Sequence, residues 1–280
     1  MGKKVISYFF WDPKREAFTL PLIDHPIVWY GVFFAFGFWV GYRIFLQLLK
    51  GQVDREVAKK LADRFTLYVV VATIIGARLG HYLFYENPFD YLIHPLILLE
   101  TWKGGLASHG GAFAIFLAIY FFSKWAKRYA PITFFGYLDL IAIPCAFAAT
   151  CIRVGNFFNQ EILGKPFDGP WAVLFAHPMD GSIPLPRHPV QLYEAIAYFA
   201  IFLFLLVLPK KKEGKRIGIF LTLVFVARFL LEFFKEEESL IFHAPITMGQ
   251  LLSLPWIVLG FYFVFSPLAS PSQIPEHTGK

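Results

Sequence analysis

The chain of 280 residues carries little charge for its length: 57% of its residues are hydrophobic, 19% are aromatic and 16% are charged, and its mean hydropathy is +0.54. A soluble domain has more charge and shorter apolar stretches, so this composition excludes an ordinary soluble protein. The net charge of +6 does not indicate nucleic-acid binding, because the basic residues form short clusters between apolar blocks. The sequence therefore predicts an integral membrane protein with no nucleic-acid partner.

The apolar residues form long blocks, each about as long as a helix that crosses a hydrocarbon core of roughly 30 Å. Helices are expected rather than strands, because lipid cannot satisfy the backbone groups of an open sheet edge. We predict an all-α, polytopic membrane helical bundle of about seven transmembrane helices, in a single membrane domain covering residues 1–280. The expected spans are Ile27–Leu49, Thr66–Tyr85, Gly104–Ser123, Ile132–Cys151, Val190–Leu208, Ile217–Phe234 and Thr247–Phe265.

The basic residues are concentrated in the connections after the first, third and fifth spans. Positively charged connections stay in the cytoplasm, which places the N-terminus outside and the C-terminus in the cytoplasm. The N-terminal tail, with basic residues of its own, opposes this orientation, but the bias of the connections is larger. We expect an outer segment at 1–26, spans one to four within 27–151, an outer connecting segment at 152–189, spans five to seven within 190–265 and a cytoplasmic tail at 266–280. The charged stretch 52–64 is expected to be an amphipathic surface helix.

With this orientation, unusual polar residues from several spans fall at one depth. Arg78 lies about 18 Å along the second span and Arg228 about 16 Å along the sixth, counted from their cytoplasmic ends. Charged groups at such a depth are costly and usually face a cavity or a partner. We therefore expect one polar chamber open toward the outer leaflet. Polar residues near the outward ends of the other spans are Tyr30, His109, Arg153, Tyr193, Glu194 and Gln250.

These residues also have ordinary structural interpretations, which the sequence leaves open. Arg228 and Glu232 are four residues apart on one helix and could neutralise each other. Arg78 could pair with Asp139 or extend toward the interface. His109, flanked by glycines, could simply be a helix-interface residue.

The densest polar cluster follows the fourth span and reads Arg-Val-Gly-Asn-Phe-Phe-Asn-Gln-Glu-Ile-Leu-Gly at 153–164. If its start is helical, Arg153, Asn156 and Gln160 share one face. A guanidinium beside amide donors at the membrane surface suits a phosphate oxygen. The alternative is a polar helix end that leaves the bilayer.

This cluster resembles the signature of the prolipoprotein diacylglyceryl transferase family, roughly Gly-Arg-x-Gly-Asn-Phe-x-Asn-x-Glu-x-x-Gly. It differs at the first position, where Ile152 replaces glycine, and in the sixth span Val224 stands where some members carry tyrosine. One such motif would be a weak signal, but several in order are specific. The other family-like blocks are 25–31, 76–85, 104–111, 188–194, 227–232 and 248–250.

The resemblance implies a bacterial inner-membrane transferase, multi-pass, with its active site toward the outer leaflet. Such an enzyme moves the sn-1,2-diacylglyceryl group from phosphatidylglycerol to the lipobox cysteine thiol of a prolipoprotein signal peptide. Glycerol 1-phosphate is released, and the reaction is the first step of lipoprotein modification. The implied partners are these two substrates and membrane lipids, with no cofactor and no metal, and we expect a monomer.

The implied mechanism assigns roles to the matched residues. Arg153 and Arg228 would stabilise the charge of the departing phosphate, because fixed cations act strongly in a low-dielectric site. His109 would act as the base, since a thiol with a pKa near 8.5 is mostly protonated at neutral pH. The expected substrate- and lipid-binding residues are Tyr30, Arg78, Asn156, Asn159, Glu161, Gly164, Tyr193, Glu194 and Glu232.

Two functions from other classes compete with a transferase. A transporter or channel for an anionic substrate would also carry intramembrane arginines, but it predicts polar residues along the whole depth or a pair of broken helices. A sensor or scaffold would need a signalling domain or an extended tail. The sequence favours the transferase because the inner halves of the spans are nearly devoid of polar residues apart from Asp139 and Arg43.

Overall fold

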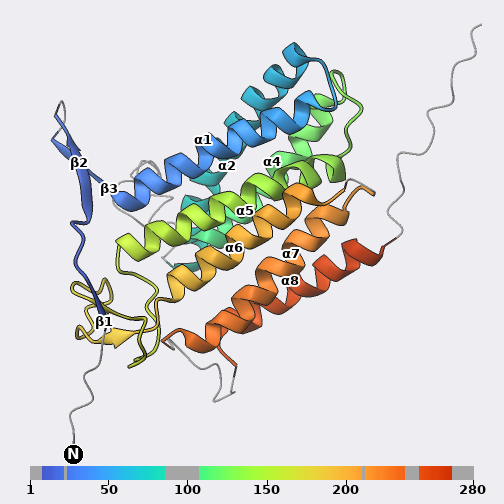
Figure 1. The fold of residues 1–280 in the computed structure, drawn as a ribbon. Helices are drawn as coiled ribbons and strands as arrows, with labels where there is room; N and C mark the ends of the chain where they lie inside the picture. The colour runs from blue at the N-terminus through green and yellow to red at the C-terminus, as the bar shows by residue number, and fades with distance from the viewer. Residues whose placement is uncertain (1–7, 22–23, 86–106, 210–211, 237–245, 267–280) are drawn as a thin grey trace, which may run out of the picture. The chain divides into compact units, whose positions relative to one another are not determined.

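The computed structural model describes residues 8–21, 24–85, 107–209, 212–236 and 246–266, and it divides into two compact units (Figure 1). Unit 1 comprises Met1–Ile44 and Ile141–Lys280, and unit 2 comprises Phe45–Leu140. Within the described residues, six helices are long and apolar enough to cross a membrane. They are α1 (Trp29–Lys50), α2 (Arg55–Tyr85), α5 (Phe134–Phe158), α6 (Val190–Val207), α7 (Lys215–Leu231, continued by the 3₁₀ turn η3, Glu232–Phe234) and α8 (Met248–Phe265).

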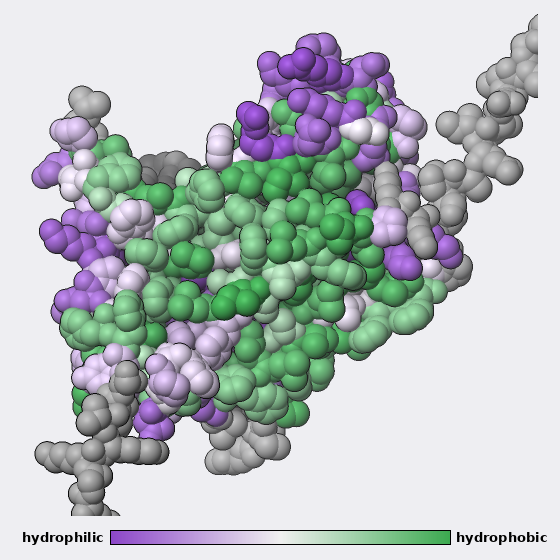
Figure 2. All heavy atoms as spheres, in the orientation of Figure 1, coloured by the Kyte–Doolittle hydropathy of each residue, from purple (hydrophilic) through white to green (hydrophobic). Residues whose placement is uncertain are grey.

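The polytopic helical fold predicted from the sequence is confirmed. The third expected span corresponds to α4 (Ser108–Ala126), whose apolar part, Gly110–Ala126, is shorter than the other spans. Large apolar side chains remain exposed along the helices, such as Val207 at 79% and Ile196 at 70%. Figure 2 shows hydrophobic residues covering the flanks of the helices. These surfaces would be costly in water and are suited to lipid.

The stretch 52–64 does not form a separate surface helix. It leads into α2, which runs without a break for 31 residues, or about 46 Å, from Arg55 to Tyr85. Ala58, Leu61 and Phe65 are buried at helical spacing, so an apolar stripe continues from the charged part into the span. No glycine or proline interrupts the helix between the two parts.

The fold class is not purely helical, because five short strands occur in the described part of unit 1. β1 (Tyr8–Trp11) pairs in parallel with β4 (Ala172–Phe175), which pairs antiparallel with β5 (Pro186–Arg187). β2 (Glu16–Leu20) and β3 (His25–Val28) form an antiparallel pair. Trp11 packs on a small core of Phe157, Leu163, Val173 and Phe175, and its indole N–H donates to the Phe157 carbonyl at 3.1 Å. The segment before α1 is therefore tied to the segment between α5 and α6.

Helix α5 ends seven residues later than the expected fourth span, at Phe158 instead of Cys151. The additional turns place Arg153 and Asn156 on the helix rather than in the outer connecting segment. Tyr30 of α1 packs against this end of α5, because a Cβ atom at Gly155 would lie 3.1 Å from its ring.

Glycines allow close helix contacts within each unit. In unit 1, Gly218 of α7 and Gly260 of α8 face each other so closely that a Cβ on either would meet the backbone or side chain of the other helix. In unit 2, Gly76 and Gly80 of α2 approach Gly110 of α4 in the same way. Helices that approach this closely gain van der Waals contacts, which drive association within lipid.

Candidate functional site

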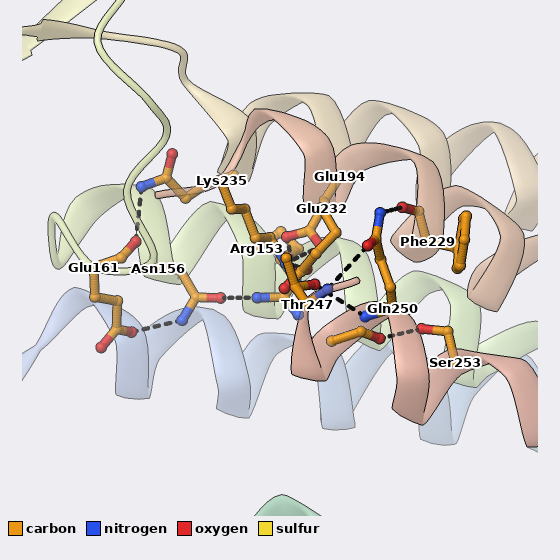
Figure 3. Close-up of polar contacts among 12 residues, drawn as sticks. Arg153, Asn156, Glu161, Glu194, Phe229, Glu232, Lys235, Thr247, Gln250 and Ser253 are labelled. Carbon is orange, nitrogen blue, oxygen red and sulfur yellow. Dashed lines mark hydrogen bonds and ion pairs between the residues drawn. The ribbon is translucent and has the colours of Figure 1, made fainter. Parts of the chain in front are cut away.

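Arg153, near the C-terminal end of α5, is held on two sides (Figure 3). Its Nε atom lies 3.0 Å from Oε2 of Glu194, near the start of α6. Its Nη1 atom donates a hydrogen bond of 3.0 Å to Oδ1 of Asn156, one turn later on α5. The Arg153 side chain is 12% exposed, so the guanidinium is almost enclosed but not sealed. Arg153, Asn156 and Glu194, all expected site residues, are thus in contact with one another through Arg153.

Glu194 joins two cations from different elements. Its side chain is completely buried, and Oε1 lies 3.0 Å from Nζ of Lys235, directly after η3. The same Nζ lies 3.0 Å from Oε2 of Glu232. Arg153, Glu194, Lys235 and Glu232 therefore form a continuous chain of alternating charge across α5, α6 and the end of α7. A buried carboxylate that serves two cations is held rigidly, because losing either partner leaves a charge uncompensated.

Glu232 pairs with Lys235 rather than with Arg228. The proposal that Arg228 and Glu232 simply neutralise each other therefore finds no support, since no ion pair joins them in the described part of the chain. Glu232 also packs against Gly249 at the start of α8, where a Cβ atom would overlap its carboxylate. Arg228 is thus left as the cation of the site without a carboxylate in contact among the described residues.

Tyr198 interacts with both arginines of the site. This tyrosine is buried on α6, one turn after Glu194. Its hydroxyl hydrogen-bonds Arg153 and interacts electrostatically with Arg228. Arg153 therefore contacts the Tyr198 phenol, and Arg228 lies within electrostatic range of the same group.

The turn after α5 places Glu161 beside Asn156. The Asn156 Nδ2 atom donates a 2.6 Å hydrogen bond to Oε1 of Glu161, and Gln191 Nε2 donates to the Glu161 carbonyl at 2.7 Å. Gln160 and Ile162, on either side of Glu161, have φ angles of 55° and 58°. A side chain in this left-handed region is strained, and such strain persists only where surrounding contacts hold it. Asn159 in the same segment is buried, and its Oδ1 atom has no hydrogen-bond partner among the described residues.

Gly164 is required by packing. A Cβ atom there would collide with the carbonyl and Cβ of His188 and with Val190. The buried Arg187 closes the same region by donating to the Gly164 carbonyl at 3.2 Å and by pairing with Glu236. The structure thus shows a packing role for Gly164, and its expected role in binding stays a prediction.

Tyr193 lies in an aromatic group at the start of α6. Its hydroxyl accepts a 2.7 Å hydrogen bond from Trp171 Nε1 and lies 3.1 Å from His188 Nδ1. The His188 ring stacks on Phe167 with ring centroids 3.9 Å apart. Burial lowers the pKa of His188, which favours the neutral imidazole.

Gln250 caps α8 and connects it to α7. The Gln250 backbone N–H donates to Thr247 Oγ1 at 3.2 Å, and Gln250 Oε1 accepts from the Thr247 backbone N–H at 3.1 Å. Its Nε2 atom donates to the Phe229 carbonyl at 3.4 Å. The reciprocal bonds form a capping box, so Gln250 orders the first turn of α8. Its bond to Phe229 joins this turn to α7, where Phe229 directly follows Arg228 in the sequence.

Arg78 and His109 belong to unit 2, where the structure places them at one level. The Ala107 N–H donates to the Ala77 carbonyl at 2.8 Å, which joins the turn of α2 carrying Arg78 to the start of α4. Arg78 is 6% exposed, and its Cζ lies 4.6 Å from the centroid of the Tyr82 ring. His109 stands in the first turn of α4, and its side chain lies outside the described part of the structure.

Several residues of the site escaped the sequence analysis. The sequence alone marked Lys235 only as a basic residue of a connection, although it follows Glu232 by three positions. Tyr198 looked like an ordinary aromatic residue of an apolar span, although it follows Glu194 by one helical turn. Spacing to a known acidic residue was the available signal in both cases.

The chemical capacity of unit 1 is that of an anion site. Two arginines approach one buried tyrosine, and one of the arginines is fixed by a carboxylate and an amide. Fixed guanidinium groups in a low-dielectric setting stabilise phosphate charge strongly. Within the described ranges, no group of three or more His, Cys, Asp or Glu side chains could hold a metal ion.

Comparison with known proteins agrees with this chemistry. The family model described as prolipoprotein diacylglyceryl transferase matches residues 16–266. Three relatives bear the name phosphatidylglycerol–prolipoprotein diacylglyceryl transferase. The one from Chloroherpeton thalassium is 44% identical over 92% of this chain and 94% of its own. The one from Tolumonas auensis is 44% identical over 90% and 94%, and the one from Protochlamydia amoebophila is 36% identical over 93% and 95%. The chain belongs to the prolipoprotein diacylglyceryl transferase family.

Proposed function

We propose that this protein transfers the sn-1,2-diacylglyceryl group of phosphatidylglycerol to the lipobox cysteine thiol of prolipoproteins and releases glycerol 1-phosphate. The observation that carries the proposal is the pairing of Arg153 with the buried Glu194, close to a phenol that also interacts with Arg228. The family membership supports the same reaction.

In the proposed reaction the cysteine sulfur attacks the glyceryl carbon bonded to the phosphate oxygen. A carbon–sulfur bond forms, the carbon–oxygen bond breaks, and its electron pair leaves on the phosphate. Arg228 is suited to receive this charge because no described carboxylate contacts it, whereas Arg153 is oriented by Glu194 and Asn156. A cation that stabilises the leaving phosphate more strongly than it stabilises the bound substrate lowers the barrier to reaction. Equal stabilisation of both would not.

The thiol must lose its proton before or during the attack. We assign this proton to His109, whose turn in unit 2 lies level with Arg78. A neutral imidazole can accept a proton at neutral pH, and the thiolate is the reactive nucleophile. Arg78 would hold a phosphate oxygen or the headgroup.

The remaining expected residues support binding rather than bond making. Asn156 can donate to a phosphate oxygen once its amide exchanges its bond to Glu161. Tyr30, Tyr193 and Asn159 would border the lipid and the peptide, and Glu232 keeps Lys235 in place.

The membrane arrangement is part of the proposal. Seven helices, α1, α2 and α4 to α8, would span a bacterial inner membrane, with the N-terminus outside and the C-terminus in the cytoplasm. The active site would open toward the outer leaflet, and the protein would act as a monomer. A common level is supported by contacts that join the C-terminal ends of α5 and α7 to the N-terminal ends of α6 and α8: Arg153 with Glu194, Glu194 with Lys235, and Gln250 with Phe229.

A lipobox peptide incubated with the purified protein and phosphatidylglycerol in lipid nanodiscs tests the proposal. We expect a gain in peptide mass equal to one diacylglyceryl group, with release of glycerol phosphate in equal amount. A peptide with serine in place of the lipobox cysteine should gain nothing. A folded protein that leaves the cysteine peptide unmodified would exclude the proposed reaction.

A further inference from the structure

A second group of cations lies in unit 2, where the start of α2 meets the end of α4. Lys60 Nζ lies 4.1 Å from the centroid of the Tyr129 ring, and Arg64 Cζ lies 5.0 Å from that of Trp125. Arg128 Cζ lies 5.5 Å from the Trp125 ring and 5.7 Å from the Tyr129 ring. These five residues form the basic aromatic cluster. Its two rings bring three like charges into one patch.

The basic aromatic cluster is both ordered and accessible. Arg128 Nε donates to the Trp125 carbonyl at 3.0 Å, and a hydrogen bond from Lys60 lowers the pKa of Tyr129. The three cations are exposed, while the two rings are half-buried. In Figure 2, hydrophilic residues cover this end of α2, which Figure 1 locates.

Charge around the cluster remains positive. Lys124 lies against the Tyr120 ring, with Nζ 4.7 Å from its centroid, and Lys59 and Lys127 are exposed nearby in the sequence. Glu56 and Asp63 are the carboxylates of this part of α2, so basic residues outnumber acidic ones. Like charges gathered on rings repel one another unless an anion joins them.

The basic aromatic cluster and Arg78, an expected lipid-binding residue of the same helix, lie far apart. Lys60 and Arg78 are 18 positions apart on α2, which corresponds to about 27 Å and is comparable to the thickness of the hydrocarbon core. If Arg78 lies near one surface of the membrane, the basic aromatic cluster therefore lies near the opposite surface.

We propose that the basic aromatic cluster binds the headgroup phosphate of anionic phospholipids in the leaflet at that end, as a site separate from catalysis. Arginine offers a planar fork to phosphate oxygens, and lysine adds a point charge. Tryptophan and tyrosine rings lie stably at the headgroup level, where basic pockets between helices recognise anionic lipids.

Nondenaturing mass spectrometry of the purified protein, titrated with dioleoyl phosphatidylserine, tests this site. Each cation near an anionic surface contributes about a fivefold gain in affinity, so K60Q/R64Q/R128Q should bind the lipid about a hundredfold more weakly. R43Q/K212Q/K215Q removes equal charge without neighbouring rings and should bind like the unaltered protein. Dioleoyl phosphatidylcholine should bind weakly to all three, and inorganic phosphate should not displace phosphatidylserine.

A second variant separates the arrangement of the cluster from its charge. W125L/Y129L keeps all cations but removes the rings that order them, and we expect severalfold weaker phosphatidylserine binding with unchanged diacylglyceryl transfer. Equal binding by both cluster variants and the unaltered protein would overturn the proposal. So would displacement by inorganic phosphate, which would indicate a free-anion site, or equal loss in the R43Q/K212Q/K215Q control.

Discussion

The Glu194 carboxylate reaches Arg153 and Lys235 at the same time, with each nitrogen 3.0 Å from its own carboxylate oxygen. A single buried anion therefore orients a cation of α5 and a cation that follows η3. Burying an ion pair is favourable only when its geometry and additional hydrogen bonds repay the loss of hydration. Asn156 supplies such a bond to Arg153, and Glu232 supplies a second partner to Lys235.

Removing either arginine of the site should strongly reduce catalysis. We expect Arg153→Ala and Arg228→Ala each to lower kcat/KM for diacylglyceryl transfer by roughly 10²- to 10³-fold, the cost of losing one fixed electrostatic donor. Arg43→Ala, an exposed basic residue of α1, serves as the matched control and should transfer at the normal rate. Full activity of either site variant in nanodiscs would remove the arginines from the mechanism.

Replacing Glu194 should cost stability as well as activity. Glu194→Ala leaves Arg153 without its carboxylate partner and Lys235 with Glu232 alone, and breaking a buried pair in this way costs about 3–5 kcal/mol in the free energy of unfolding. Glu194→Gln/Lys235→Met removes one of those cations and should recover part of the loss. Denaturant titration of the three proteins in detergent measures the difference. A double variant no more stable than Glu194→Ala would show that the charges do not act together.

The tight contact at Gly164 predicts a steric effect. Gly164→Ala introduces a methyl group against the His188 backbone and should destabilise the protein by about 1–3 kcal/mol. At Gly31 of α1, nothing lies within 4 Å of an added Cβ atom, so alanine fits at this helical position without overlap. Gly31→Ala should thus leave the thermal midpoint unchanged or raise it. Equal midpoints for the two variants would contradict the packing role of Gly164.

The half-buried His188 predicts a loss of stability in mild acid. Its pKa is lowered in the folded protein, so the unfolded chain, with a histidine pKa of about 6.5, binds the proton more readily. The contribution is complete above about pH 6.5 and is lost as the pH falls toward the folded pKa. His188→Gln should therefore show a smaller drop in thermal midpoint between pH 7.5 and pH 5 than the unaltered protein. An identical drop would assign the acid sensitivity to other groups.

The proposed base is tested by the pH dependence of the rate. If His109 takes the thiol proton, His109→Gln should reduce transfer by about 10²- to 10⁴-fold near neutral pH. Raising the pH toward the thiol pKa of about 8.5 should recover part of the rate, because more of the peptide is already thiolate. Normal rates for His109→Gln throughout a series from pH 6 to pH 9 would exclude this role.

The helices could be predicted from the sequence because lipid imposes a simple requirement: about 20 apolar residues without a break. The grouping of Arg153 with Asn156 also followed from their spacing of one helical turn. The link from Glu194 to Lys235 could not be predicted in this way, because these residues lie on different elements 41 positions apart and neither helix periodicity nor composition relates them.

The strands and the length of α2 escaped prediction for different reasons. β1 and β4 are short and gain their pairing only from partners far away in the chain, so no local pattern marks them. The charged start of α2 looked like a surface helix because its polar face dominates the composition. Its buried stripe of Ala58, Leu61 and Phe65 decides the outcome, and that stripe is apparent only when it is followed into the span.

The parallel pairing of β1 with β4 has a consequence for biosynthesis. Tyr8 leaves the ribosome well before its partner Ala172, which emerges only after α1, α2, α4 and α5 have been made. β1 therefore stays unpaired while these four helices are made, and the small core around Trp11 closes late. Completion of the three-stranded sheet is in this sense coupled to synthesis of the helices that lie between β1 and β4 in the chain.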